Sequence, residues 1–422
     1  MTDPGHALDD LIETVPWSRL AHAYGVALDA PPWLRALAAC VEGSTSEGLE
    51  ELEDWLLTTV VHQGTPYSAT APVLWIARRI LGDGSTHPAL AWCLLAVGES
   101  ATALRWLAEP DADRPGNESE PQRSAAGQPL WATYLPLDRE LAKKRGNRVD
   151  DDYFLAAPAD VVTLTACILD WEQTVVDCVR DRRFLDEAID AGSAMVRLAP
   201  SPALVHALLS LVDGPEDTGR RAASAFALAA SGWATPEVDA LIDHDDRAIR
   251  VAAALGCPDH PQALKTLVGA AADRNWVRAT FPRGFIGPEP WLTSALLVAL
   301  LDRVSVDAAD GRLVDGLEQQ LATVAYGPFG ATYEWGRLLA WLFPDRWQPA
   351  SYIDVPTSDD LSTTQRRLLA ALARNDDPWE QGAGNASLVL GQVGLPHDRA
   401  VVAALAGVEV PRRRSWWRRW TS

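Results

Sequence analysis

The residue types that bind transition metals come together in one part of this sequence. His244, Cys257 and His260 are near one another in the chain, and Asp245 or Asp246 could complete the four ligands that zinc prefers. Their spacing matches no standard zinc motif, and an aspartate at this position is also suited to cap a helix. We therefore predict that these residues hold no metal.

Carboxylates that could bind magnesium form two groups, one made by Asp9, Asp10 and Glu13 and the other by residues 150–152. Magnesium would need these oxygens to converge on a cavity, but one group lies in a terminal segment and the other adjoins a linker. The sequence also has no glycine-rich phosphate loop after a strand and no Gly-x-Ser-x-Gly motif. We expect no cofactor and no catalytic residues, and the sequence leans away from an enzyme.

An acidic residue followed five positions later by an arginine occurs three times in the middle of the chain. Successive arginines are 29 and 28 residues apart, and an apolar segment of helical periodicity precedes each pair. The pairs are Glu216/Arg221, Asp245/Arg250 and Asp273/Arg278. The spacing fits one helix, a turn and a second helix, and such a hairpin must stack on its neighbours to cover its apolar face. The sequence therefore predicts an all-α fold, an α-solenoid of stacked antiparallel helix hairpins in a curved superhelix.

The middle copy shows why helices are expected at these positions. Pro236 suits the first turn of a helix, where its missing N–H group costs nothing. Either Asp245 or Asp246 can cap the second helix, which Gly256 and Pro258 should end.

This pattern resembles HEAT-repeat proteins, in which an aspartate in the turn and an arginine early in the second helix form a ladder between adjacent repeats. The resemblance implies that the three acid/arginine pairs are a structural ladder, and their recurrence once per repeat also favours stability over catalysis. The repeat is shorter than the roughly 40 residues that are usual for HEAT units.

The segment 62–70 reads His-Gln-Gly-Thr-Pro-Tyr-Ser-Ala-Thr. It resembles a signature of a largely uncharacterised actinobacterial group of HEAT-repeat proteins, which residues 361–405 also resemble. His62, Thr65 and Tyr67 are candidate binding residues there, although a structured corner between two helices is the alternative interpretation. Tryptophans that recur on the N-terminal helices are interpreted as core residues: Trp17, Trp33, Trp55, Trp75, Trp92 and Trp106.

Two connections after the repeats are rich in aromatic residues and glycine, at 281–291 and 326–335. With residues 62–70 they could form one recognition rim, since aromatic residues and arginines are typical anchors of interfaces. Plain packing of the loop aromatics is the alternative. The candidate rim residues in these connections and just after them are Arg283, Phe285, Phe329, Tyr333, Trp335 and Arg337.

The chain divides on composition into four parts: N-terminal helical repeats at 1–108, a flexible linker or insertion at 109–130, a HEAT-like array with a C-terminal cap at 131–405, and a basic tail at 406–422. The tail interleaves arginine and tryptophan, a composition that suits an anionic membrane surface, RNA or an acidic groove. Its basic and aromatic residues are Arg412, Arg413, Arg414, Trp416, Trp417, Arg418, Arg419 and Trp420.

The formal net charge of the 422 residues is -20, and removing the five tail arginines leaves -25. A body of this charge repels nucleic-acid phosphates, so DNA is an unfavourable partner and a basic protein is a favourable one. Five scattered cysteines do not suggest a disulfide framework, and the acidic N-terminus does not resemble a signal peptide. These features predict a cytoplasmic protein.

Together these patterns favour a non-enzymatic scaffold that binds a protein partner and sequesters a basic protein, for example as an immunity or regulatory protein. One alternative is a helical enzyme whose aromatic pocket, lined by Tyr67, Trp75, Phe285, Phe329 and Trp335, acts on a small apolar or phosphorylated ligand. Another is an adaptor that reaches a membrane or RNA through its tail.

Overall fold

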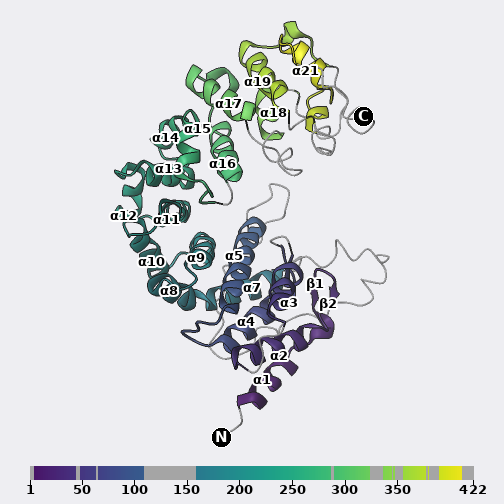
Figure 1. The fold of residues 1–422 in the computed structure, drawn as a ribbon, viewed down its shortest axis with the longest axis vertical. Coiled ribbons are helices and arrows are strands. Elements are labelled where there is room, and N and C mark those ends of the chain that lie inside the picture. The colour runs from purple at the N-terminus through teal and green to yellow at the C-terminus, as the bar shows by residue number, and fades with distance from the viewer. Residues whose placement is uncertain are drawn as a thin grey trace, which may run out of the picture. The chain divides into compact units, whose positions relative to one another are not determined.

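In the computed structural model, the residues described are 4–43, 48–62, 65–108, 158–286, 289–323, 336–344, 346, 355–376, 379 and 389–410. This part of the chain consists of helices packed against one another, apart from two short antiparallel strand pairs (Figure 1). The prediction of an all-α fold is confirmed for these residues. The packing is also compatible with an α-solenoid.

The chain divides into two compact units. The first contains residues 1–216 and 223–238, and the second contains residues 217–222 and 239–422. The boundary therefore falls inside the region that the sequence analysis assigns to one repeat array. The predicted linker at 109–130 lies outside the described residues.

The first unit begins with a mixture of short elements. In chain order they are α1 (Pro4–Glu13), the 3-10 turn η1 (Trp17–Arg19), β1 (Ala21–His22), β2 (Gly25–Val26), α2 (Ala30–Val41), α3 (Leu49–Asp54), the π-helical turn η2 (Trp55–Val60), β3 (Val61–His62), β4 (Thr65–Pro66), α4 (Thr70–Leu81) and α5 (Ala89–Ala108). The helices of this region agree with the sequence analysis, whereas the strand pairs were not expected.

Contacts between residues distant in sequence hold the two strand pairs. β1 pairs with β2 through Ala21↔Val26 and His22↔Gly25, and β3 pairs with β4 through Val61↔Pro66 and His62↔Thr65. The backbone N–H of Ala23 donates to the carbonyl of Thr59 at 3.0 Å, and that of Ala69 donates to the carbonyl of Ala21 at 3.0 Å. The β1–β2 hairpin thus bonds to the residues on either side of the β3–β4 hairpin, which local sequence patterns do not reveal.

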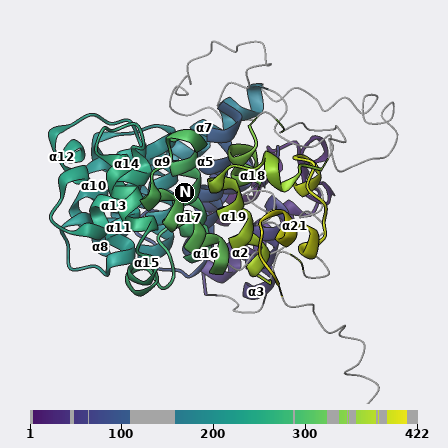
Figure 2. The ribbon, with the colours of Figure 1, turned by 90° about the horizontal axis from the view of Figure 1, so that it is seen from above.

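The remaining helices of the first unit follow the undescribed stretch: α7 (Pro158–Asp170), α8 (Glu172–Asp181), α9 (Leu185–Leu198) and α10 (Pro202–Val212). α5 and α9 lie side by side in both views (Figures 1 and 2). They approach so closely that a Cβ atom on Gly98 would lie 3.2 Å from the Cα of Ala191. The helices before and after the predicted linker therefore share one core.

α11 (Thr218–Ala230) and α12 (Pro236–Asp239) cross the boundary between the units. The second unit continues with η4 (Ala240–Asp243), α13 (Arg247–Gly256), α14 (Ala263–Ala271), α15 (Arg274–Thr280), α16 (Glu289–Leu301), η5 (Val306–Ala308), α17 (Gly311–Thr323), α18 (Gly336–Leu342), η7 (Ser358–Asp360), α19 (Thr363–Arg374) and α21 (Arg399–Leu405). α13 and α14 are neighbours in both views (Figures 1 and 2).

Helix ends from α12 onward follow the capping chemistry of the sequence. Pro236 begins α12, and α13 ends at Gly256 as predicted. Asp246, not Asp245, caps α13, because its Oδ1 accepts the N–H of Ala248 at 2.8 Å. Ser362 and Gln365 form a reciprocal capping box at the start of α19.

No helix among the described residues is both long enough and apolar enough to cross a membrane.

Candidate functional site

The predicted binding residues of segment 62–70 lie at the β3–β4 hairpin of the first unit. The ring of His62 is half-exposed, and its Nδ1 lies 2.7 Å from the carbonyl of Thr58. Tyr67 is buried, and its backbone N–H donates to Oγ1 of Thr70 at 2.8 Å. Thr65 belongs to β4, and its side chain lies outside the described atoms. Hydrogen bonds around Tyr67 and Thr70 give this segment the structured corner that was the alternative interpretation.

The predicted rim residues of the second unit are only partly described. Phe285 is buried and packs edge to face on Phe281, with ring centroids 5.0 Å apart, while Trp276 contacts Phe281 at 5.8 Å. Arg283 is exposed beside this cluster. The loop aromatics Phe281 and Phe285 are therefore packed inward and not displayed.

The other predicted rim residues cannot be placed, and the rim stays a prediction. Phe329, Tyr333 and Trp335 lie outside the described residues, as does the side chain of Arg337 on α18. Of the alternative enzyme pocket, Trp75 is covered by the guanidinium of Arg79, whose Cζ lies 3.1 Å from the ring centroid.

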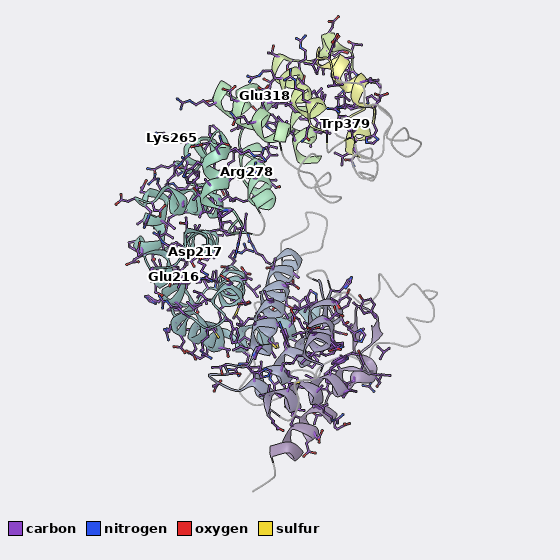
Figure 3. All side chains as sticks on the ribbon, in the orientation of Figure 1. Glu216, Asp217, Lys265, Arg278, Glu318 and Trp379 are labelled. Atoms are coloured by element: carbon purple, nitrogen blue, oxygen red, sulfur yellow. The ribbon has the colours of Figure 1, made fainter. Side chains whose placement is uncertain are left out.

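Arginine–carboxylate pairs connect successive helix hairpins. In the first unit, Arg182 Nη2 lies 2.8 Å from Glu216 Oε1. In the second unit, Arg221 Nη1 lies 3.0 Å from Asp246 Oδ2, and Arg247 Nη1 lies 2.8 Å from Asp273 Oδ2. These contacts join residues that are 34, 25 and 26 positions apart in the sequence. Glu216 and Asp217 lie at the turn between α10 and α11 (Figure 3).

The ladder contacts differ in detail from the assignment made on sequence. Asp246 and Arg247 make the described ion pairs, whereas Arg250 Nη1 donates to the backbone carbonyl of Asp245 at 2.8 Å. The hydrogen bond from Arg247 holds the pKa of Asp273 below its usual value, and the N–H of Trp276 adds to this effect. Arg278 is exposed on α15 (Figure 3). Either of two consecutive aspartates in a turn can cap the helix and pair with an arginine, and here the packing selects Asp246.

The candidate zinc residues do not form a metal site. His244 Nδ1 accepts the N–H of Asp246 at 3.0 Å, and His260 Nδ1 accepts the N–H of Gln262 at 3.3 Å. Both rings therefore satisfy backbone donors in turns. Within the described ranges, no group of three or more His, Cys, Asp or Glu side chains is arranged to hold a metal ion.

A different site emerges in the first unit, in an open groove of about 490 Å³ between α2 and the α3–η2 segment. Its lining residues are Trp33, Glu50, Glu51, Asp54, Trp55 and Thr59. We call it the acidic tryptophan groove. Three exposed carboxylates surround two indole rings, so the groove combines negative charge with flat apolar surface.

The two indoles of the groove are stacked and firmly held. The ring centroids of Trp33 and Trp55 are 5.8 Å apart with an interplanar angle of 19°. Trp55 is buried, and its Nε1–H donates to Asp29 Oδ2 at 3.0 Å. Trp33 is half-exposed and lies on the open side of the pair.

Asp29 is fixed by a second hydrogen bond. Its Oδ1 lies 2.7 Å from Nε2 of the buried His22. Since His22 Nδ1 accepts the backbone N–H of Tyr24 at 3.2 Å, its proton is on Nε2 and is donated to Asp29. The β1–β2 hairpin thus orients the carboxylate that orients Trp55.

A π-helical turn carries two of the groove residues, Trp55 and Thr59. η2 runs from Trp55 to Val60 and continues directly from α3. A wider turn of this kind is rare and frequently marks a functional site, because it rotates side chains away from their regular helical positions. The run Glu50–Trp55, with four acids before a tryptophan, is the signal that sequence reasoning could have used.

Comparison with known proteins finds no family model, curated protein or solved structure that matches this chain.

Proposed function

We propose that the protein is a non-catalytic, HEAT-like α-solenoid that binds a basic protein partner. The stacked helix pairs and the ladder-like ion pairs Arg221–Asp246 and Arg247–Asp273 support the solenoid. The net charge of -20 supports a basic partner and disfavours DNA.

The observation that carries this proposal is the acidic tryptophan groove. Glu50, Glu51 and Asp54 are exposed at its rim, and none of them forms an ion pair with any described residue. Elsewhere in the described chain, many carboxylates already have an arginine partner, as Asp9 and Glu13 have in Arg35. The groove keeps its negative charge available for a ligand.

A protein of this kind would act by occupying the basic surface of its partner, as an immunity or regulatory protein does. Such a role needs no reaction at the groove, only shape and charge complementarity. We place it in the cytoplasm, where cysteines stay reduced.

A labelled peptide of alternating arginine and glycine tests the proposal by fluorescence anisotropy. We expect the full chain to bind it at low salt and to release it at about 1 M salt, where the Debye length is about 3 Å. Replacing the three rim acids (Glu50→Gln, Glu51→Gln, Asp54→Asn) should weaken binding about tenfold, since each exposed pair contributes about 0.2–1 kcal/mol.

A charge-matched control separates the groove from the general field of an acidic protein. Asp239→Asn, Asp243→Asn and Glu409→Gln remove the same charge from exposed positions outside the groove, and this variant should bind nearly as well as the parent. Equal losses in the two variants, or no binding by the parent chain, would refute a specific groove.

A further inference from the structure

The exposed face of the acidic tryptophan groove is preorganised for a flat ligand. Trp33 rests on Trp55, which the chain His22–Asp29–Trp55 holds through hydrogen bonds of 2.7 Å and 3.0 Å. The backbone N–H of Trp33 also donates to the carbonyl of Asp29 at 3.4 Å. An aromatic face that is fixed before binding loses little entropy when a ligand stacks on it.

Acceptors surround this face. Glu51 and Asp54 are exposed, on the turn of α3 that leads into Trp55. Thr58 Oγ1 donates to the backbone carbonyl of Asp54 at 2.7 Å, and this contact leaves the Asp54 carboxylate unoccupied.

Thr59 adds a hydroxyl group to the lining of the groove. Its residue is only 8% exposed, yet it lines the groove. Its backbone carbonyl accepts the N–H of Ala23, but within the described part of the chain its hydroxyl has no hydrogen-bond partner. Its Oγ1 is not among the enclosed, unpaired polar atoms of the described residues, so it reaches the groove, where a donor or acceptor from a bound molecule can take the place of water.

We propose that the groove binds an arginine side chain, with the guanidinium plane on Trp33 and its N–H groups donated to Glu51, Asp54 and the Thr59 hydroxyl. The inference rests on the proposed function and specifies which residue of the basic partner is recognised. A guanidinium combines a flat, weakly hydrated face with several in-plane donors, whereas a lysine ammonium is a compact and strongly hydrated charge. One indole face surrounded by acceptors therefore fits a guanidinium better than an ammonium group.

Exposed apolar residues on and just after the β1–β2 hairpin extend the expected ligand. Tyr24 is 67% exposed and Leu28 is 64% exposed, and Val26 is exposed between them. The hairpin that carries Tyr24 is bonded to the groove through Ala23 and Thr59, and Leu28 directly precedes Asp29. We expect an arginine with a large apolar neighbour to bind more tightly than an isolated arginine.

The structural role of the tryptophans does not account for the groove. A small apolar cavity below the pair is lined by core residues such as Leu34, Leu52 and Val73, which explains why Trp55 is buried. Nothing in that packing requires acids around the open face of Trp33 or an unpaired hydroxyl at Thr59.

Four peptides of equal length and charge test the inference by calorimetry on the full chain. They carry arginine or lysine, each with either leucine or glycine as the neighbouring residue. The arginine peptides should bind about tenfold more tightly than the lysine peptides, in the range that a partly desolvated cation–π contact supplies. The arginine–leucine peptide should bind best, and Leu28→Ser should abolish only the advantage of leucine.

Two groove variants isolate the proposed contacts. Thr59→Val keeps the side-chain volume and should weaken arginine binding about threefold or more through the lost hydrogen bond. Trp33→Leu should remove the preference for arginine over lysine but leave the salt-dependent attraction. Thermal melts of both variants check that the fold is intact. The double variant Glu51→Gln with Asp54→Asn tests the acceptors separately, because both side chains are exposed and their replacement leaves the packing unchanged.

The outcomes separate this inference from the function on which it rests. Equal affinity for arginine and lysine peptides, with the groove acids still required, would overturn arginine recognition and leave a basic-partner site. An arginine preference that survives Trp33→Leu and Thr59→Val would also overturn it. Failure of every peptide to bind would overturn the proposed function itself.

Discussion

Burial controls the chemistry of the cysteine side chains. Cys40, Cys93, Cys167 and Cys178 are buried, whereas Cys257 is exposed. Burial raises the pKa of Cys93 to about 12, and it raises the pKa of Cys167 and Cys178 as well. Because the thiolate is the reactive form, these buried thiols should be inert in the folded protein.

We therefore expect an alkylating reagent at about pH 8 to modify Cys257 quickly and the other four cysteines only after denaturation. Mass spectrometry of the labelled protein measures the stoichiometry and the modified residue. A Cys257→Ser variant is the control and should show almost no rapid labelling. Rapid modification of Cys93 or Cys167 in the native chain would contradict the burial of these two side chains.

The prediction that the N-terminal tryptophans are core residues holds for some of them and not for others. Trp17 and Trp55 are buried, as the interpretation of the N-terminal tryptophans as core residues requires. Trp33, Trp75 and Trp92 belong to the same pattern but are half-exposed, and Trp33 lies on the open side of the groove. Sequence spacing cannot separate these cases, because the partner that stacks on Trp33 is 22 residues away and reaches it only through the folding of α2 against α3.

At the scale of elements, close helix contacts depend on single glycines. α17 approaches α14 so closely that a Cβ atom on Gly316 would lie 3.3 Å from the backbone of Ala271. Gly269 lies on α14 itself, and a Cβ atom there would meet nothing within 4 Å. The two glycines belong to the same unit and make a matched pair.

Gly316→Val should destabilise the second unit by about 1–3 kcal/mol, because the added methyl groups force the helices apart. Gly269→Ala should stabilise it by about 0.5–1 kcal/mol, since alanine is the better helix former. Denaturant unfolding followed by circular dichroism measures both effects. Similar stability changes of the same sign in the two variants would refute the close contact.

Asp190 on α9 gives the first unit a pH dependence. Burial raises the pKa of Asp190 to about 6, and the negative charges of Asp186 and Glu187 raise it further. The folded state therefore disfavours the ionised form, and stability falls as the pH rises from the ordinary carboxyl pKa through about 6. Asp190 is nevertheless exposed, so the neighbouring protein desolvates its carboxyl only in part and solvent screening reduces the effect.

Asp190→Asn should raise the melting temperature at about pH 8 by about 1–2 °C and leave it unchanged at about pH 4, where the carboxyl is already neutral. Glu187→Gln should act in the same direction at the higher pH by removing a neighbouring negative charge. Thermal melts across the pH range measure the difference. A larger gain at about pH 4 than at about pH 8 would contradict the raised pKa.

At the scale of the whole molecule, charge is unevenly distributed along the sequence. The chain carries -20 overall, yet five arginines fall between residues 412 and 419, outside the described residues. A basic segment with interleaved tryptophans suits an anionic lipid surface, where each basic residue contributes about 1 kcal/mol.

We expect removal of residues 411–422 to lower binding to anionic vesicles by more than about tenfold, on the basis of that contribution for each arginine. Co-sedimentation with vesicles of anionic and of neutral lipid measures the change, and neutral vesicles should show little binding with or without the tail. Unchanged binding to anionic vesicles after truncation would refute a membrane contact through this segment.

The sequence alone determined the helical class and the local ends of helices, because these depend on short-range chemistry. The apolar periodicity, Pro236 at the start of α12 and Gly256 at the end of α13 were all readable from neighbouring residues. Tertiary structure decided which aspartate of the pair Asp245–Asp246 caps the helix, because the choice depends on where Arg221 arrives.

Tertiary structure also decided the candidate site. The hairpin at residues 21–26 bonds to Thr59 and Ala69, which flank the hairpin at residues 61–66, and the His22–Asp29–Trp55 network ties the same hairpin to η2. Those contacts join residues that are far apart along the chain. The acidic residues and the tryptophans can therefore be recognised in the sequence, but only long-range hydrogen bonds and packing bring them together around one groove.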